Sequence, residues 1–396
     1  MTDRVLIVGG GIGGLVAALC FAEQGFEVEV FERAAELSEI GAGIQLSPNA
    51  THVLHGLGLE QSLRSVAFLP AATEFRGWKK GEVISQNALG ESALSRYGAP
   101  YYHIHRADLI EVLLLAVEAA PLIRLHTNAE VFDFSQTDAG VRLRTASAEY
   151  EGALLVGADG IHSVVRATLF GKQSPRFTGN VAWRGLVPTE LLPKDLIRPV
   201  STAWWGPGKH FVHYYVRRGE LVNCVCVVEK SGWEVESWNE RGDHGELKAD
   251  FAGWHDSIQM LIDAMDPAAC YKWALFDRPP MERWSDGRVT LLGDACHPTL
   301  PFMAQGAAMA IEDGAVLVRC IADSSDIASS LARYETLRIA RTAAVQKGSR
   351  RNASVFHMSG IKAWVRNRAA QRAGSRAVDG LYSYNPLDGL GALGSE

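Results

Sequence analysis

The feature that most constrains this chain is a glycine-rich turn that directly follows an apolar run. Residues Arg4–Val8 are almost wholly apolar, which is typical of a strand buried on both faces of a parallel sheet. Gly9, Gly11 and Gly14 then match the pattern G-x-G-x-x-G. The following residues, Leu15–Gln24, have the composition of a helix. Because such a turn places backbone N–H groups and a helix N-terminus against a pyrophosphate, we expect a dinucleotide site here.

A second strand and an acidic residue complete this unit. Residues Glu27–Phe31 alternate as a strand, and Glu32 follows at its end. A carboxylate at this place accepts hydrogen bonds from the ribose of a dinucleotide, but the pattern does not distinguish NAD from FAD. The pattern recurs at Gly389, Gly391 and Gly394, without a strand before it or room for a helix after it. We interpret that second match as chance.

Composition excludes several classes of protein. The length of 396 residues predicts two to three domains. The net charge of −6 argues against nucleic-acid binding. Its six cysteines form no C-x-x-C pair, so we expect no structural metal and a reducing, cytoplasmic compartment. The uncharged stretch Val5–Ala22 contains five glycines. We therefore expect neither a transmembrane segment nor a signal peptide there.

The charge is distributed unevenly. The segment Thr336–Val378 contains ten lysines and arginines and no acid, so it carries +10 and, with −6 overall, the rest carries −16. The simplest interpretation is a basic helix docked on an acidic body. Steering of anionic substrates, or contact with a membrane surface or nucleic acid, are the alternatives.

The middle of the chain differs in character from its start. Residues 180–266 contain six of the ten tryptophans, paired alternating runs and turn dipeptides such as Gly206-Pro207. This pattern predicts an antiparallel sheet with one face on a core.

Two glycine–aspartate motifs each follow a short buried strand. Gly157-Ala158-Asp159-Gly160 follows Leu154–Val156, and Gly293-Asp294-Ala295 follows Val289–Leu292. The carboxyl ends of parallel strands are where α/β sheets place ligand groups. Taken singly, Asp-Gly turns and helix caps explain these motifs equally well.

Taken together, the three motifs resemble the single-component FAD-dependent aromatic hydroxylases (group A flavoprotein monooxygenases), especially those acting on salicylate and 3-hydroxybenzoate. The resemblance covers residues 4 to about 350. It implies an α/β fold: a Rossmann-like FAD-binding domain (GR2/PHBH type) with an inserted antiparallel β-sheet substrate domain and a C-terminal helical segment. The implied boundaries are 1–178 and 272–345 for the FAD-binding domain, 179–271 for the substrate domain, and 346–396 for the basic helical segment and tail.

The resemblance also implies cofactor contacts. Asp294 would meet the ribityl chain, and the backbone of Gly306 and Ala307 the pyrimidine edge of the isoalloxazine. The full set of implied FAD-binding residues is Gly9, Gly11, Gly14, Glu32, Arg33, Gln45, Arg106, Asp159, Asp294, Gly306 and Ala307. Since only one fingerprint is valid, NADH or NADPH would bind transiently over the flavin.

The family reaction requires a base. NAD(P)H reduces the flavin, O2 forms a C4a-hydroperoxide, and an electron-rich ring attacks its distal oxygen. A phenol (pKa about 10) attacks better as phenolate, and a histidine (pKa about 6.5) can accept its proton. His210 and Tyr214 share one face of a predicted strand, and His213 faces the other way.

The family places a histidine and a tyrosine at this offset. We therefore assign His210 as base or hydrogen-bond partner of the phenol and Tyr214 as the orienting residue, with a purely structural role for either as the alternative. Arg184 could receive a carboxylate or be structural.

The implied substrate is a small phenolic carboxylate such as salicylate, because Leu300-Pro301-Phe302-Met303 is closest to the salicylate-type loop. The alternatives are 3-hydroxybenzoate 6-hydroxylase or 6-hydroxynicotinate 3-monooxygenase activity. A nicotinamide dehydrogenase would leave both Gly-Asp motifs unexplained, and a non-catalytic FAD protein would need no histidine–tyrosine pair. The oligomeric state is open, with a homodimer as one candidate.

Overall fold

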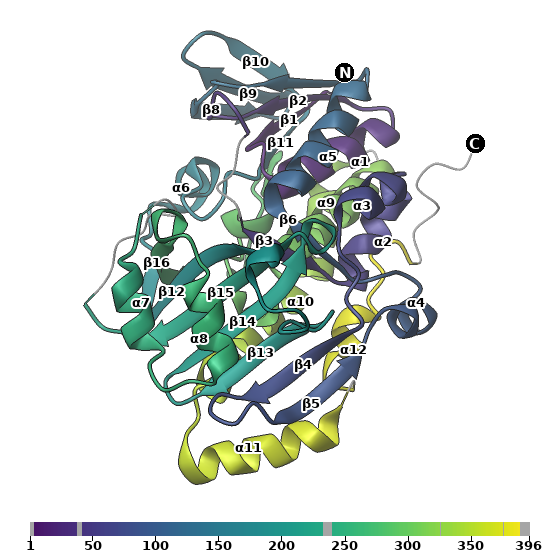
Figure 1. The fold of residues 1–396 in the computed structure, drawn as a ribbon. Helices are drawn as coiled ribbons and strands as arrows, with labels where there is room; N and C mark the ends of the chain where they lie inside the picture. Colours follow the sequence, from purple (N-terminus) through teal and green to yellow (C-terminus); the bar gives the residue numbers. More distant parts are fainter. Residues whose placement is uncertain (1–3, 38–41, 233–239, 325, 375, 389–396) are drawn as a thin grey trace.

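The computed structural model describes residues 4–37, 42–232, 240–324, 326–374 and 376–388. Its first part is a five-stranded, all-parallel sheet covered on one side by helices and on the other by a small antiparallel sheet (Figure 1). In spatial order its strands are β17 (Val289–Leu291), β11 (Leu154–Gly157), β1 (Arg4–Val8), β2 (Glu27–Phe31) and β7 (Ile123–His126). The predicted β-α-β start is confirmed, with α1 beginning at Ile12 and ending at Glu23.

Three helices pack on this sheet because their apolar faces complete its core. They are α1, α5 (Arg106–Ala119) and α9 (Gly306–Ala322). The opposite layer is an antiparallel sheet of β8 (Val131–Thr137), β9 (Gly140–Thr145) and β10 (Glu149–Gly152). The carboxyl ends of β1, β11 and β17 therefore bring all three glycine-containing motifs to one edge.

The second part is a seven-stranded sheet. In spatial order it contains β16 (Tyr271–Asp277), β12 (Arg176–Pro188), β15 (Leu221–Glu229), β14 (Lys209–Val216), β13 (Ser201–Gly206), β4 (Ala72–Gly77) and β5 (Val83–Ala88). Every pair is antiparallel except β13 with β4. The sheet is thus not confined to 179–271, since β4 and β5 come from the part predicted to bind FAD. The domain boundaries stay a prediction.

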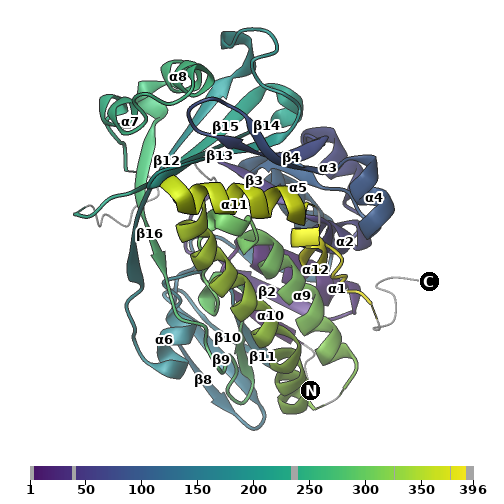
Figure 2. The same ribbon diagram turned by 90° about the horizontal axis from the view of Figure 1, so that it is seen from below.

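Both faces of this sheet are covered, so the expectation of one core-facing side was wrong. The outer face packs against α7 (His244–Asp250) and α8 (Asp256–Asp263). The inner face lies toward the parallel-sheet half and the helices α10 (Ile327–Phe356) and α11 (Gly360–Ala373) (Figure 2). Apolar residues occur at successive positions of these strands because both sides are buried. Trp233 and Trp238 lie outside the described residues, as do Gly389, Gly391 and Gly394.

Short elements join the two halves. The remaining ones are β3 (Gly43–Leu46), β6 (Tyr102–His105), α2 (Pro48–Gly56), α3 (Glu60–Val66), α4 (Glu91–Tyr97), α6 (Val164–Phe170), α12 (Arg376–Tyr382) and the 3-10 turns η1 (Thr189–Leu191), η2 (Arg217–Gly219), η3 (Pro267–Ala269), η4 (Gly293–Ala295) and η5 (Pro301–Met303). The amide of Gly43 donates to Asn223 Oδ1 at 2.8 Å. A Cβ at Gly43 would lie 2.8 Å from the Tyr214 ring, so only glycine fits where β3 meets the seven-stranded sheet.

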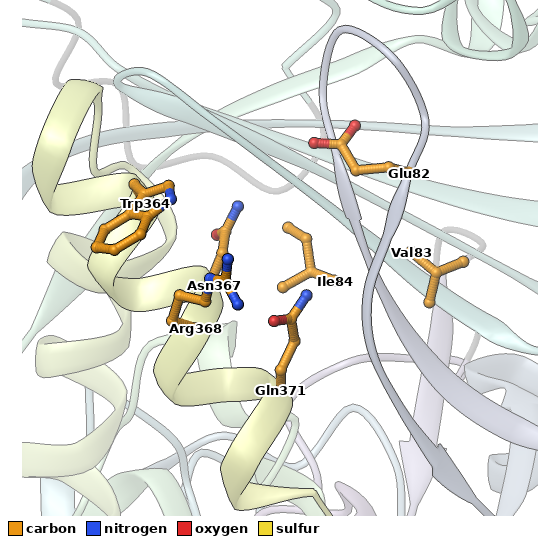
Figure 3. Close-up of a pocket in the computed structure, with 7 residues that line it drawn as sticks. All are labelled: Glu82, Val83, Ile84, Trp364, Asn367, Arg368 and Gln371. Carbon is orange, nitrogen blue, oxygen red and sulfur yellow. The ribbon is translucent and has the colours of Figure 1, made fainter.

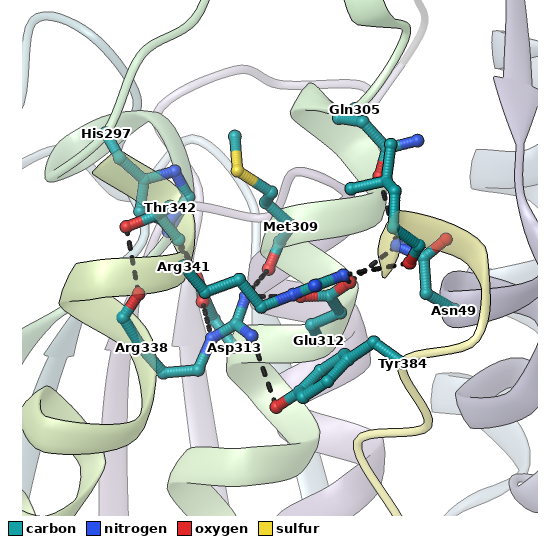
Figure 4. Close-up of polar contacts among 12 residues, drawn as sticks. Asn49, His297, Gln305, Met309, Glu312, Asp313, Arg338, Arg341, Thr342 and Tyr384 are labelled. Atoms are coloured by element: carbon teal, nitrogen blue, oxygen red, sulfur yellow. Dashed lines mark hydrogen bonds and ion pairs between the residues drawn. The ribbon is translucent and has the colours of Figure 1, made fainter. Parts of the chain in front are cut away.

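The basic C-terminal segment docks on buried acids of the body, as expected. Arg338 is fully buried and pairs with Glu312 at 2.6 Å and Asp313 at 2.7 Å (Figure 4). Arg341 pairs with Glu312, and Arg350 with Asp277. Breaking such a buried pair by removing one partner costs about 3–5 kcal/mol, so these contacts fix α10 against α9 and against the end of β16. The last described helix, α12, ends at Tyr382, so helix continues beyond the acid-free stretch that ends at Val378.

Within the described part of the chain, no helix combines the length and the apolar character needed to cross a membrane. The uncharged stretch Val5–Ala22 is divided between β1, the glycine turn and α1.

Candidate active site

In the first glycine turn there is no room for a side chain at Gly9 or Gly14, but there is free space at Gly11. Gly9 has a φ of +107°, and a Cβ at Gly14 would lie 2.0 Å from the Gly9 carbonyl oxygen. A Cβ at Gly11 would meet no atom within 4 Å. Gly11 precedes α1, whose first N–H groups have no partner within the helix. The turn therefore fits the pyrophosphate of a dinucleotide at Gly11.

Glu32 ties this turn to the end of β2. Its two carboxylate oxygens accept from the amides of Gly10 and Ala34, each at 2.8 Å. Arg33 beside it is exposed. The carboxylate thus shapes the turn, and its contact with a ribose stays a prediction.

Asp159 holds the start of helix α6. Ser163 Oγ donates to its carboxylate at 2.5 Å, and the amide of Val164 donates at 2.7 Å. Burial raises the pKa of Asp159, and these bonds oppose that shift. The helix-cap explanation therefore accounts for its side chain, while its backbone packs on Gly9.

Asp294 and Arg106 act on each other across the same edge of the fold. Asp294 is exposed, yet the surrounding protein raises the pKa of its carboxyl through desolvation, opposed by His297 and Arg106. Burial lowers the pKa of Arg106, and Asp294 opposes that shift. An exposed carboxylate beside the half-buried Arg106 fits the polar chain of a cofactor.

The N-terminus of α9 carries Gly306 and Ala307, both half-buried. Gln305, just before the helix, donates to Ser47 Oγ at 2.8 Å and accepts from Asn49 at 3.0 Å (Figure 4). These bonds hold the start of α9 against α2. The unpaired first N–H groups of α9 can therefore face a planar acceptor edge.

Gln45 and Tyr214 meet where β3 approaches the sheet. Gln45 accepts from Tyr101 Oη at 2.7 Å and also contributes a hydrogen bond to the Tyr214 hydroxyl. Tyr214 is buried and packs on His103, with ring centroids 4.6 Å apart. Burial raises the pKa of Tyr214, and Arg184 opposes that shift. Tyr214 is therefore a neutral hydrogen-bonding group.

His210 lies on the same inner face as Tyr214, whereas His213 lies on the outer face. His210 is buried between Phe302 and Phe356, at centroid distances of 5.1 and 5.4 Å. Its Nδ1 is 2.8 Å from His357 Nε2. Burial, and to a smaller extent the neighbouring His357, lowers the pKa of His210 well below the usual value, so the ring is neutral at pH 7.

A half-exposed row of side chains lies between these two residues. Val212, Val225 and Arg184 stand directly opposite one another on β14, β15 and β12, and all three are half-buried. The rows on both sides are buried, through His210 with Val227 and Tyr214 with Asn223. Arg184 is roughly 10 Å from Val212 by strand spacing. The inner face is therefore open above this row and closed around it.

Arg184 is held over the Trp273 ring, 4.4 Å from its centroid. Burial lowers the pKa of Arg184 to about 10, with Tyr214 opposing and Arg106 adding to the shift. The guanidinium stays charged at pH 7 and is poorly hydrated, which suits it to a carboxylate.

The sequence reasoning missed His357 and Glu229. His357 Nδ1 is 2.8 Å from Glu229 Oε1, so the two extend the contact made by His210. His357 lies 147 positions from His210 in the chain and no motif surrounds it. Glu229 is the last residue of β15, and nothing in the sequence linked it to a site.

One buried cluster has the composition of a metal site. Cys296, His297 and Asp313 lie together and are enclosed. Asp313, however, already accepts from His297 at 2.5 Å and from Arg338 at 2.7 Å (Figure 4). Because the Arg338 guanidinium neutralises this carboxylate, the cluster suits a structural role better than cation binding.

A surface hollow of about 300 Å³ lies between β5 and α11 (Figure 3). Its walls are formed by Glu82, Val83, Ile84, Trp364, Asn367, Arg368 and Gln371. None of the predicted site residues lines it, so it is separate from the site described above.

The parallel sheet, its glycine turn and the covering sheet are the arrangement of a dinucleotide-binding flavoprotein. Aromatic side chains, among them Phe302 and Phe356, pack around His210 on the inner face of the covering sheet. Residues 2–349 match the model of the FAD binding domain family. The chain belongs to this family and is an FAD-dependent aromatic-ring monooxygenase.

Three relatives resemble almost the whole chain. It is 40% identical over 373 residues to 3-amino-4-hydroxybenzoate 2-monooxygenase PtnB3 of Streptomyces platensis, covering 93% of each. It is 36% identical over 389 residues to 3-hydroxybenzoate 6-hydroxylase of Polaromonas naphthalenivorans, covering 96% of each. It is 37% identical over 355 residues to 6-hydroxynicotinate 3-monooxygenase of Bordetella bronchiseptica, covering 88% of this chain and 91% of the relative.

Two solved structures share the fold over 97% of this chain and 96% of theirs. Klebsiella pneumoniae HpxO, complexed with FAD and uric acid, has a TM-score of 0.86 at 26% identity. A salicylate hydroxylase substrate complex has a TM-score of 0.80 at 25% identity. These matches agree with the predicted fold class.

Proposed function

We propose that this protein hydroxylates the ring of a small phenolic carboxylate, with NADH or NADPH as reductant and O2 as co-substrate. The observation that carries the proposal is the half-exposed row on the inner face. It offers an apolar floor at Val212 and Val225, a neutral imidazole on one side at His210, and a cation at its end in Arg184. A flat ring with one hydroxyl and one carboxylate requires an apolar surface for the ring, a proton acceptor for the hydroxyl and a cation for the carboxylate.

The residues of this chain would divide the work. The glycine turn, Arg106 and Asp294 would hold FAD, which when bound supplies the oxygen-transfer chemistry. His210 would take the phenolic proton, Tyr214 would orient the ring, and Phe302 would help to keep water out.

The names of the relatives narrow the class of substrate that we propose for this protein. Their names give 3-amino-4-hydroxybenzoate, 3-hydroxybenzoate and 6-hydroxynicotinate, each a ring with a hydroxyl group and a carboxylate that are not adjacent. The salicylate hydroxylase, whose substrate has these groups adjacent, is less similar in sequence. We therefore rank 3- and 4-hydroxybenzoate-type acids first and salicylate after them.

The test is consumption of NADH and of NADPH by the purified holoenzyme with each of five acids: salicylate, 3- and 4-hydroxybenzoate, 3-amino-4-hydroxybenzoate and 6-hydroxynicotinate. At least one acid should speed oxidation and yield a hydroxylated product with little H2O2. Protein without bound or reconstitutable flavin, or flavin protein that none of these acids stimulates, would contradict the proposal.

The six cysteines are all free and buried. This supports a place in the reducing cytoplasm, which a retained activity in cytosolic extract would test.

A further inference from the structure

A continuous line of hydrogen bonds leads from the inner face to the surface. His210 Nδ1 is 2.8 Å from His357 Nε2, and His357 Nδ1 is 2.8 Å from Glu229 Oε1. The side chain of His357 is only 2% exposed, whereas that of Glu229 is 55% exposed. The line therefore begins beside the proposed ring site and ends in solvent.

The backbone fixes this line in place. Gly208 has a φ of +65° and forms the turn before β14. Its amide donates to the His357 carbonyl at 3.0 Å, and its carbonyl accepts from the Glu229 amide at 2.9 Å. One glycine turn thus holds the end of α10 and the end of β15 next to His210.

The chemistry of the last member sets the direction of every bond. An ionised carboxylate can only accept, so the proton between Glu229 and His357 lies on His357 Nδ1. A neutral His357 then accepts at Nε2, so His210 must donate from Nδ1. Nε2 of His210 is left as a bare acceptor.

That acceptor is available to a ligand. Nε2 of His210 has no hydrogen-bond partner among the described residues, and it is not one of their enclosed, unpartnered polar atoms. This nitrogen therefore keeps a small accessible surface, on a residue that is only 2% exposed as a whole, and that surface is where a bound phenol would meet it.

We propose that His210, His357 and Glu229 form a proton relay that carries the phenolic proton of the substrate to solvent. The proposal rests on the proposed function, because it needs a phenol at His210. His357 and Glu229 contact neither the ring nor the cofactor in this scheme, so they act through His210.

The transfer balances without a charged intermediate on either ring. The phenol O–H gives its proton to His210 Nε2, the Nδ1 proton of His210 moves to His357 Nε2, and the Nδ1 proton of His357 moves to Glu229. Glu229 then releases a proton to water, and the phenolate remains.

The burial of His210 explains why a relay is needed. Its lowered pKa means that an imidazolium ion is costly there, so His210 is a poor place to store a proton. Burial also lowers the pKa of His357, with Glu229 opposing and Arg366 adding to the shift. Arg366 from α11, which donates to the carbonyls of Val355 and Phe356, is the other charged group beside His357. A proton that passes on to the exposed Glu229 leaves no positive charge on either of the two buried histidines.

The first test does not depend on turnover. Histidine 15N NMR of the holoenzyme at neutral pH should place a proton on Nδ1 and none on Nε2 in both His210 and His357. The signals are assigned by comparison with variants in which one histidine at a time is replaced. A proton on Nε2 of His210 would overturn the relay.

The second test uses Glu229→Gln, whose amide oxygen can still accept from His357 but cannot take up a proton. Glu220→Gln is the matched control, because Glu220 is exposed and flanks the other end of β15. With 3-hydroxybenzoate as the probe, Glu229→Gln should lower kcat about tenfold to a hundredfold at pH 7, with KM unchanged. The loss should shrink as pH rises toward about 10, where the phenol ionises unaided.

The outcomes separate the two proposals. If the wild type hydroxylates 3-hydroxybenzoate and Glu229→Gln matches it, the relay is wrong and the function stands. A loss in Glu229→Gln that persists at high pH would mark a structural role and also overturn the relay. If wild type hydroxylates none of the five acids, the proposed function fails, and the relay fails with it even if NMR finds the expected tautomers.

Discussion

The two faces of the seven-stranded sheet carry matching residues with different surroundings. His210 on the inner face and His213 on the outer face are three positions apart on β14 and are 2% and 4% exposed. His213 Nε2 accepts from the indole of Trp204 at 3.0 Å, and burial lowers its pKa to about 3. His210 instead bonds a second histidine that reaches a surface carboxylate.

The difference shows that burial and residue type do not identify a catalytic histidine. Both rings are buried and neutral. The indole N–H of Trp204 is too weak an acid to give up its proton, so this hydrogen bond only holds His213 in place. His210 differs because its partners can move a proton and because its other nitrogen has no hydrogen-bond partner among the described residues.

The largest expected effect follows from removing the inner histidine. His210→Ala should lower kcat for hydroxylation about 10²–10⁴-fold, because the phenol loses its proton acceptor. Bound FAD and the circular-dichroism spectrum should be unchanged, and NADH oxidation should shift toward H2O2. Coupled turnover within twofold of wild type would refute the role of His210.

The next effect concerns the cation at the end of the half-exposed row. Arg184→Met should raise KM for a hydroxybenzoate about 10–100-fold, since a charge-assisted bond is worth about 1.5–3 kcal/mol. The matched measurement uses a hydroxybenzamide, which lacks the charge and should lose little affinity. An equal loss for both compounds would assign Arg184 a structural role.

A third change addresses the outer face. His213→Phe should leave kcat within about twofold, yet it should lower the free energy of unfolding by about 1–3 kcal/mol, because the Trp204 indole N–H loses its acceptor. Denaturant unfolding and steady-state kinetics on one preparation measure both. A loss of hydroxylation without a loss of stability would erase the contrast between the faces.

Tyr214→Phe should have a smaller effect, about threefold to tenfold on kcat/KM, because the ring and its packing on His103 remain and one hydrogen bond is lost. The fraction of NADH lost to H2O2 should rise modestly. An effect as large as that of His210→Ala would make Tyr214, rather than His210, the proton acceptor.

The smallest expected effect is that of pH near neutrality. Because the pKa of His210 is lowered, the ring stays neutral as pH falls through about 6.5, and kcat/KM should show no inflection there. A clear loss of activity centred on that pH would indicate a histidine with an ordinary pKa as the base.

The sequence predicted those parts of the molecule that depend on residues close together in the chain. The glycine turn, its flanking strand and helix, and the shared face of His210 and Tyr214 follow from spacing within a few residues. The three motifs meet because parallel strands end at one edge of the sheet.

Contacts distant in the chain could not be predicted in this way. Nothing local pairs β4 with β13, which are separated by more than a hundred residues, or brings His357 to His210. The basic segment was visible, but its partners Glu312 and Asp313 were not singled out. Two adjacent acids within the apolar helix α9 are the signal that could have identified them, since buried charges need partners.

The most direct measurement is a crystal structure of the FAD-loaded enzyme with 3-hydroxybenzoate bound. The ring should lie over Val212 and Val225, with its hydroxyl within hydrogen-bond distance of His210 Nε2 and its carboxylate toward Arg184. A ligand in the hollow beside Trp364, or a ring on the inner face whose hydroxyl points away from His210, would contradict the account.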